Sequence, residues 1–240
     1  MKLNNFDAIF RSQLVDLTRQ YFLEQKFTEI ISPVFVDHPA YESTLTAYQV
    51  GPSYLATSPE MYLKKLISEN QVGNCFSIAH CFRDLEDNTI YHLPEFLMLE
   101  WYELGVNDIA TQNRTIQLLQ YIYSHLNLKL PPVDYLSLSS LDPTLSEPNF
   151  NQKFLNEIEP QIPQDKLVFV TDYPTHLSFF SETQKDNPLL CQRFEAYINR
   201  IEIANGNTED TKNPFNIPPC SGCGFGLDRL MLILKNAKML

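Results

Sequence analysis

The sequence predicts an α+β fold, in which an antiparallel β-sheet is flanked by helices. Segments with the apolar spacing of helices are mixed with short strand-like runs, without the regular strand–helix–strand alternation of a parallel sheet. The chain has 240 residues, 44% of them hydrophobic and 20% charged, which is enough to bury a core without disulfides or metals. We therefore expect a single domain over residues 1–240.

Four helices are expected in addition to a short one near residues 151–158. Aromatic and apolar side chains recur every three or four residues over 6–22, which predicts an amphipathic helix. Ser58, Pro59 and Glu60 have the order of an N-cap, a first-turn proline and a first-turn acid, so a second helix should run to about residue 69. The remaining helices are predicted over 108–126 and after Gly226.

Strands are expected where the chain reads as extended and apolar. The segment 27–36 carries Pro33, which places it at a sheet edge or an interface. Residues 129–165 are rich in proline and polar side chains, so we expect irregular structure there, with a short helix near 151–158. The other predicted strands cover 75–82, 95–103, 167–172 and 190–204.

The balance of charges restricts the partners. Eighteen basic and twenty-nine acidic side chains give a formal net charge of −11, which argues against a broad nucleic-acid surface but leaves room for a small basic patch around a nucleotide. No apolar run reaches the roughly 18 residues of a membrane span, and the N-terminal segment has no secretory pattern. We expect a cytoplasmic protein that does not contact membranes.

The C-terminal fifth combines cysteines and glycines. Five cysteines in such a chain are expected to be free thiols, and the pair Cys220 and Cys223 has no second pair of matching spacing, so zinc is not expected. Four of the seven glycines lie between residues 206 and 226, which permits close backbone approach. Arg229, just inside the following helix, can reach a phosphate or stack on a base.

A carboxylate is predicted to be buried in the strand 95–103. Side chains alternate between the two faces of a strand, so Phe96, Met98, Glu100 and Tyr102 share one face. A buried carboxylate is costly without a cationic partner. Glu100 is therefore either half of a structural ion pair or part of a pocket for a cationic group of a ligand.

Two further acids are expected on a hairpin. If the turn spans Tyr197 to Arg200, Glu195 lies directly opposite Glu202, which is an unfavourable arrangement of like charges. A divalent cation would relieve it, since Mg²⁺ uses one or two carboxylates together with substrate phosphates. The alternative is a pair of solvated acids on an open sheet face.

Five segments, in order, resemble the catalytic core of the class II aminoacyl-tRNA synthetases. Residues 27–33 are similar to motif 1, the dimer-forming strand, although Lys26 stands where the family has glycine. Residues 82–96 are similar to motif 2, and residues 222–229 to motif 3. The lysine-type branch, which contains lysyl-tRNA synthetase and a stand-alone paralogue that modifies elongation factor P, is resembled by residues 58–64 and 194–209.

The resemblance implies a site for ATP. Arg83 would contact the α-phosphate and stabilise charge on the transferring group, and it would act with Arg229 in catalysis. His92 would reach the terminal phosphates. Phe96 would stack on one face of the adenine and Arg229 on the other.

The resemblance also implies a bound Mg²⁺, held against the phosphates by Glu195 and Glu202. Two more residues are assigned to the ATP site, Glu86 and Gly226. Glu86 follows Leu85, which replaces a glutamate of the family.

A pocket for an amino acid is the third implication. Glu60 would bind the α-ammonium group. Several carboxylates around one pocket fit a substrate with two ammonium groups, such as lysine or a lysine isomer. The implied substrate-binding residues are Ser58, Glu60, Glu100, Tyr102, Asn205, Glu209 and Gly224.

The expected function is therefore ATP-dependent activation of a lysine-like amino acid to an aminoacyl-adenylate. No anticodon-binding domain fits, and the acidic balance favours a protein acceptor such as elongation factor P. Motif 1 implies a homodimer. Two alternatives stay open: a tRNA-charging or asparagine-synthetase-like paralogue, suggested by residues 87–89 and His92-Leu93, and a module that binds ATP or an amino acid with weakened catalysis, suggested by Leu85.

Overall fold

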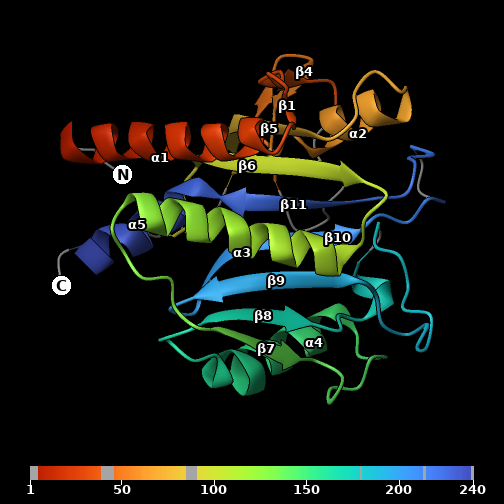
Figure 1. Cartoon of the computed structure of the whole chain (residues 1–240). Helices are drawn as coiled ribbons and strands as arrows, with labels where there is room; N and C mark the ends of the chain where they lie inside the picture. The colour runs from red at the N-terminus through yellow and green to blue at the C-terminus, as the bar shows by residue number, and fades with distance from the viewer. Residues whose placement is uncertain (1–4, 39–45, 85–90, 179, 213–214, 239–240) are drawn as a thin grey trace. The chain divides into compact units, whose positions relative to one another are not determined.

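The computed structural model describes residues 5–38, 46–84, 91–178, 180–212 and 215–238 (Figure 1). The chain forms two compact units. The first contains Met1–Tyr102 and Gly224–Leu240, and the second contains Glu103–Cys223. Each unit is described by itself below. The organisation as a single domain stays a prediction.

The described residues of the first unit form three helices and two groups of strands. Its helices are α1 (Asn5–Glu24), α2 (Glu60–Ser68) and α5 (Leu227–Lys238). Its longer strands are β5 (Cys75–Phe82) and β6 (Glu95–Leu104, which ends in the second unit), with the short β1 (Thr28–Glu29) on the other side of β5. The small second sheet has the order β2 (Phe35–Val36), β4 (Ser53–Leu55), β3 (Gln49–Val50).

The helices of the first unit follow the predicted apolar spacing. Phe10, Leu14 and Phe22 of α1 are buried, and α1 packs against α5. The backbone N–H of Glu60 donates to the hydroxyl of Ser58 at 3.3 Å, so Ser58 caps α2 as its sequence position predicts. The helices predicted over 6–22, to about residue 69 and after Gly226 are confirmed within a few residues.

The sheet is mixed, so the prediction of an antiparallel sheet is wrong in part. Strands β5 and β6 are antiparallel, with Cys81 opposite Phe96, but β1 runs parallel to β5. The second unit contains another parallel pair, β7 (Val133–Ser137) and β8 (Leu167–Thr171). In both parallel pairs a long connection that contains a helix separates the two strands in the sequence, which is what parallel pairing requires.

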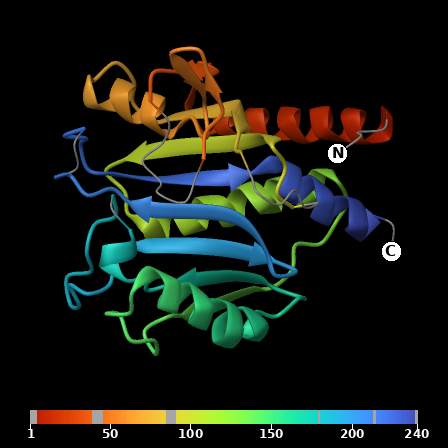
Figure 2. The same cartoon turned by 180° about the vertical axis from the view of Figure 1, so that it is seen from behind.

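The second unit is built on the strand order β10-β9-β8-β7. Strands β9 (Arg193–Ile198) and β10 (Ile201–Thr208) form a hairpin, and the first residues of β11 (Cys220–Gly226) lie beside β10. Helix α3 (Asp108–His125) packs against β9 and β10, and Figure 2 shows these strands in front of it. The predicted irregular stretch contains β7, α4 (Glu147–Lys153), a π-helical turn (Phe154–Ile158) and a 3-10 turn (Glu159–Gln161), and a further 3-10 turn covers Thr175–Leu177.

The hairpin turn is tighter than predicted. Ile198 pairs with Ile201, so the loop holds only Asn199 and Arg200, whose φ angles of 54° and 61° are those of a type I′ turn. As a consequence Glu202 lies opposite Tyr197 and not opposite Glu195. The prediction that the two acids face one another directly is therefore wrong.

Lys26 explains why a glycine is usual at its position. Its φ of 63° is in the left-handed region, and its N–H donates to the carbonyl of Leu23 at 3.0 Å just after α1 ends. A residue other than glycine adopts this conformation at a cost of about 1–2 kcal/mol. Lys26 therefore adopts, at this turn, a backbone conformation that glycine takes at no steric cost.

All five cysteines are free thiols, as the sequence predicts, and the structure shows that all five are buried. Among the described residues, no helix combines the length and the apolar character that crossing a bilayer requires.

Candidate active site

A cluster of cationic side chains lies beside an aromatic ring in the first unit. The guanidinium carbon of Arg83 lies 5.2 Å from the centre of the Phe96 ring. Arg229 donates from Nε to the carbonyl of Tyr91 at 3.1 Å. The pKa of His92 is lowered, first by burial and then by the positive charges of Arg229 and Arg83, which shows that His92 lies near both arginines. This part of the unit is suited to bind phosphate oxygens.

An ion pair on α2 faces a buried tyrosine and carboxylate of β6. The ammonium of Lys64 lies 2.6 Å from Oε1 of Glu60, and its side chain is only 1% exposed. The same ammonium lies 5.7 Å from the centre of the Tyr102 ring. The Tyr102 hydroxyl in turn donates to Oε1 of buried Glu100 at 2.9 Å. Three of the predicted substrate-binding residues are thus brought together around an internal ammonium.

The surroundings of Glu100 are strongly desolvated. Burial, and after it the nearby charge of Glu100, together raise the pKa values of the thiols of Cys75 and Cys81 to about 12. Ser77 lies directly opposite Glu100 on β5. Glu100 therefore sits in an environment where a cationic partner contributes strongly.

The hairpin of the second unit presents a polar face. Arg193 donates from Nη2 to Oε1 of Glu195 at 2.7 Å, and the hydroxyl of Tyr197 donates to the other oxygen of the same carboxylate. Asn205 lies directly opposite Glu195, and Glu202 opposite Tyr197. Since opposed residues share a face, Glu195, Glu202 and Asn205 all lie on this side of the hairpin.

The pKa of Tyr197 is raised by burial and by the charges of both Glu195 and Glu202. Burial raises its pKa well above the ordinary value, and the charges of Glu195 and then Glu202 raise it further. Both carboxylates therefore lie near the phenol, although they are diagonal to one another. Two carboxylates on one face fit a Mg²⁺ ion that takes its other ligands from phosphates and water. Among the residues that the structure describes, no group of three or more His, Cys, Asp or Glu side chains could hold a metal ion.

Glu209 directly follows the last residue of β10. It is 2% exposed, and its Oε1 accepts a hydrogen bond from Nδ2 of Asn207 at 3.2 Å. Its backbone N–H donates to the carbonyl of Cys220 at 2.9 Å. Glu209 is therefore a second deeply buried acid, after Glu100, among the predicted substrate-binding residues.

The glycines have different surroundings. A Cβ added at Gly226 would make only ordinary contacts with the side chain of Arg229, the nearest at 3.5 Å. Gly224 lies in β11 and is half-buried. Glu86 and Leu85 lie outside the described residues, so the structure does not place them.

The predicted residues fall into two sets, one in each unit. The first unit holds Ser58, Glu60, Arg83, His92, Phe96, Glu100, Tyr102, Gly224, Gly226 and Arg229, and the second holds Glu195, Glu202, Asn205 and Glu209. Sequence reasoning gave no role to Lys64, Arg193 and Tyr197, which bind the predicted acids. Lys64 follows Glu60 by one helical turn, and the other two flank Glu195 on the same strand face, so spacing alone was a usable signal.

Comparison with known proteins gives one family and a set of relatives. The sequence profile of the tRNA synthetases class II (D, K and N) matches residues 4–216. The elongation factor P–(R)-β-lysine ligase of Buchnera aphidicola subsp. Acyrthosiphon pisum (strain APS) is 26% identical over 305 aligned positions, which cover 97% of this chain and 92% of the relative. The protein of the same name from Baumannia cicadellinicola subsp. Homalodisca coagulata is also 26% identical, with the same coverage.

A more distant relative with that name, from Yersinia pestis (strain Pestoides F), is 25% identical over 298 positions, with 96% of this chain and 91% of the relative covered. The alignments are longer than the 240 residues of this chain. The relatives therefore contain segments that have no counterpart here.

Proposed function

Because the chain belongs to the class II tRNA synthetases of the D, K and N type, we propose that it is an ATP-dependent ligase for lysine or a lysine-like amino acid. It forms an aminoacyl-adenylate, and an amine of a protein then attacks the acyl carbon, so that an amide bond forms and AMP leaves. The names of the relatives, elongation factor P–(R)-β-lysine ligase, support elongation factor P as the acceptor. Recognition of an anticodon has no part in this proposal.

ATP is assigned to the cationic cluster of the first unit. The phosphates are held by Arg83, His92 and Arg229. The adenine stacks on Phe96, and Gly226 lies beside Arg229. The carboxylate oxygen of the amino acid attacks the α-phosphorus in line, the bond to the bridging oxygen breaks, and pyrophosphate leaves. Arg83 stabilises the negative charge that develops on the α-phosphate oxygens.

The amino acid is assigned to the buried acids. The observation that carries this assignment is the ammonium of Lys64, held by Glu60 over the face of Tyr102, because an ammonium substrate needs the same carboxylate and aromatic surroundings. Glu60 remains 26% exposed, so its carboxylate is accessible to a second ammonium. The other contacts proposed within the first unit are Ser58, Glu100, Tyr102 and Gly224. Asn205 and Glu209 of the second unit stay predicted substrate-binding residues.

Mg²⁺ is assigned to Glu195 and Glu202, the residues that would hold it. When bound, the ion would neutralise phosphate charge. Arg193 and Tyr197 donate to the two oxygens of the Glu195 carboxylate and so orient it.

The protein is further proposed to act as a cytoplasmic homodimer. Large apolar side chains are exposed close to Pro33 in the segment that resembles motif 1: Ile31 is 92% and Phe35 58% exposed. A second copy of the chain would cover them.

The test is ATP–pyrophosphate exchange with lysine, (R)-β-lysine, ornithine and aspartate offered separately. Exchange with at least one of the three diamino acids is expected. Arg83→Gln should abolish it, and Asp134→Asn, which changes an exposed acid of the second unit, should leave it unchanged. Exchange with aspartate alone would show that the amino acid has been assigned to the wrong class.

A further inference from the structure

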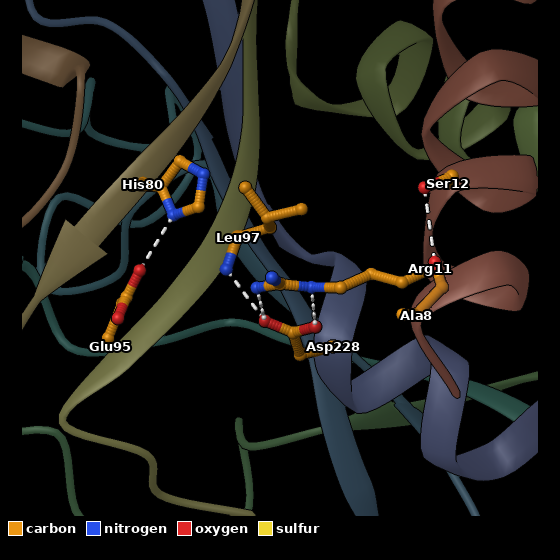
Figure 3. Close-up of polar contacts among 7 residues, drawn as sticks. All are labelled: Ala8, Arg11, Ser12, His80, Glu95, Leu97 and Asp228. Atoms are coloured by element: carbon orange, nitrogen blue, oxygen red, sulfur yellow. Dashed lines mark hydrogen bonds and ion pairs between the residues drawn. The ribbon is translucent and has the colours of Figure 1, made fainter. Parts of the chain in front are cut away.

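One carboxylate ties three elements of the first unit together. Oδ1 of Asp228 accepts from Nε of Arg11 at 2.7 Å, and Oδ2 accepts from Nη2 of the same guanidinium at 2.7 Å (Figure 3). Oδ2 also accepts from the backbone N–H of Leu97 at 2.7 Å. The fork-to-fork geometry fixes orientation as well as distance. Helix α1, strand β6 and the first turn of α5 therefore meet at Asp228.

The ion pair between Arg11 and Asp228 is shielded from water. The side chain of Asp228 is 6% exposed and that of Arg11 20%. A charge-assisted pair in such a place is screened little by salt. The carboxylate also lies in the first turn of α5, where the helix dipole favours a negative charge. The pair is therefore a rigid feature of the unit.

The Arg11–Asp228 pair is linked to the proposed ATP site by its neighbours in the sequence. Asp228 directly precedes Arg229, and the N–H of Leu97 belongs to the peptide group that joins it to Phe96. One carboxylate thus restrains the backbone beside both residues assigned to the adenine. Figure 3 shows the side chain of Asp228 reaching across to the Leu97 backbone while Arg11 approaches from α1.

A second ion pair joins the same two helices. Nζ of Lys235 on α5 lies 2.6 Å from Oδ1 of Asp7 on α1. Lys235 follows Asp228 by about two helical turns, and its side chain is 28% exposed. This pair serves as an internal control, because it holds α1 to α5 at a distance from Phe96 and Arg229 in the sequence.

We propose that Arg11 and Asp228 are positioning residues for ATP: they set the separation between Arg229 on α5 and Phe96 on β6. The proposal rests on the proposed function, which assigns the adenine to Phe96 and Arg229. The pair touches no reacting atom. Its loss should weaken ATP binding and leave the amino-acid pocket unaffected.

The experiment compares Arg11→Gln and Arg11→Lys with the matched control Lys235→Gln. Each protein is measured by urea unfolding, by calorimetry with ATP and Mg²⁺ in the absence of amino acid, and by exchange kinetics. Arg11→Gln should raise the Kd and KM for ATP roughly tenfold, since small misplacements of binding groups have effects of this size. The KM for the amino acid should change by less than about twofold. Arg11→Lys keeps the positive charge but loses the two parallel hydrogen bonds to Asp228. Its Kd and KM for ATP should lie between those of Arg11→Gln and the wild type.

Lys235→Gln should lower the urea midpoint without changing the KM for ATP. Equal effects of Arg11→Gln and Lys235→Gln on ATP binding would overturn the positioning role, and so would unchanged ATP binding in Arg11→Gln. If the wild type binds ATP but exchanges with no diamino acid, the proposed function fails, and the order of the variants in ATP affinity still decides the role of Arg11. A wild type that binds no ATP would overturn both.

Discussion

The ammonium nitrogen of Lys64 lies 2.6 Å from Oε1 of Glu60, the carboxylate assigned to the α-ammonium of the substrate. Lys64 is the buried partner, with a side chain that is 1% exposed, whereas that of Glu60 is 26% exposed. Under the proposed function, a bound amino acid would share Glu60 with Lys64. The ion pair at Glu60 is therefore observed, and its part in a ligand pocket is a proposal.

The Glu60–Lys64 pair should make a measurable contribution to stability. Single variants Glu60→Gln and Lys64→Met, and the double variant, would be unfolded in urea. We expect a coupling energy of about 1–3 kcal/mol, because Lys64 is almost fully buried and loses a carboxylate in the single variant. Additivity of the two changes to within about 0.5 kcal/mol would contradict the pair's importance.

His92 should respond to the loss of a neighbouring guanidinium. Removing the positive charge of Arg229 in Arg229→Met favours protonation, so the pKa of His92 should rise. It should stay below the ordinary value, because burial is the largest cause of the lowering and persists. An NMR titration of the imidazole gives the result, with Lys235→Met as the control for charge removal elsewhere in the unit. If the pKa of His92 does not rise in Arg229→Met, the charge of Arg229 does not act on His92.

Gly206 should not tolerate a side chain. A Cβ there would lie 2.6 Å from Cζ of buried Phe194 and 2.8 Å from the carbonyl oxygen of Gly222. Gly206→Ala is expected to lower the free energy of unfolding by about 1–3 kcal/mol, since both neighbours are held in the core. Gly73→Ala is the matched control, because a Cβ at Gly73 meets nothing within 4 Å, and it should change stability by less than about 0.5 kcal/mol. Equal stability of the two variants would be inconsistent with this packing.

Tyr123 should contribute to alkaline unfolding. Burial raises its pKa to about 12 in the folded protein, against about 10 for an unfolded chain. Its contribution is fully present below pH 10 and is lost as the pH rises through 12, because the unfolded chain releases the proton first. Between pH 9 and pH 11, Tyr123→Phe should lose about 1.4 kcal/mol less stability than the wild type. Tyr135→Phe, at an exposed position, should behave like the wild type, and the same behaviour in Tyr123→Phe would refute the effect.

Local signals were sufficient for most elements. The cap at Ser58 and the apolar spacing of α1 are properties of short segments, so both were predictable. Strand β7 was not predicted, because it lies in a proline-rich stretch and depends on its parallel pairing with β8, thirty residues later in the chain. Non-local pairing leaves little trace in local composition.

The hairpin shows how one turn changes a site. Asn199 readily takes a left-handed conformation but Arg200 does so rarely, so the two-residue loop had no clear signal. The pairing also shifts between Glu202 and Ala204. The residue types of the candidate site were therefore predictable from the sequence, and the register that places Glu195 opposite Asn205 was not.

Transfer of the aminoacyl group to a protein is tested by offering two acceptors in one reaction. The protein is incubated with ATP, Mg²⁺ and the diamino acid that supports exchange, together with purified elongation factor P and total tRNA, and both acceptors are analysed by mass spectrometry. We expect one aminoacyl group attached to a lysine of elongation factor P, and uncharged tRNA. Charged tRNA with unmodified elongation factor P would contradict the proposed function.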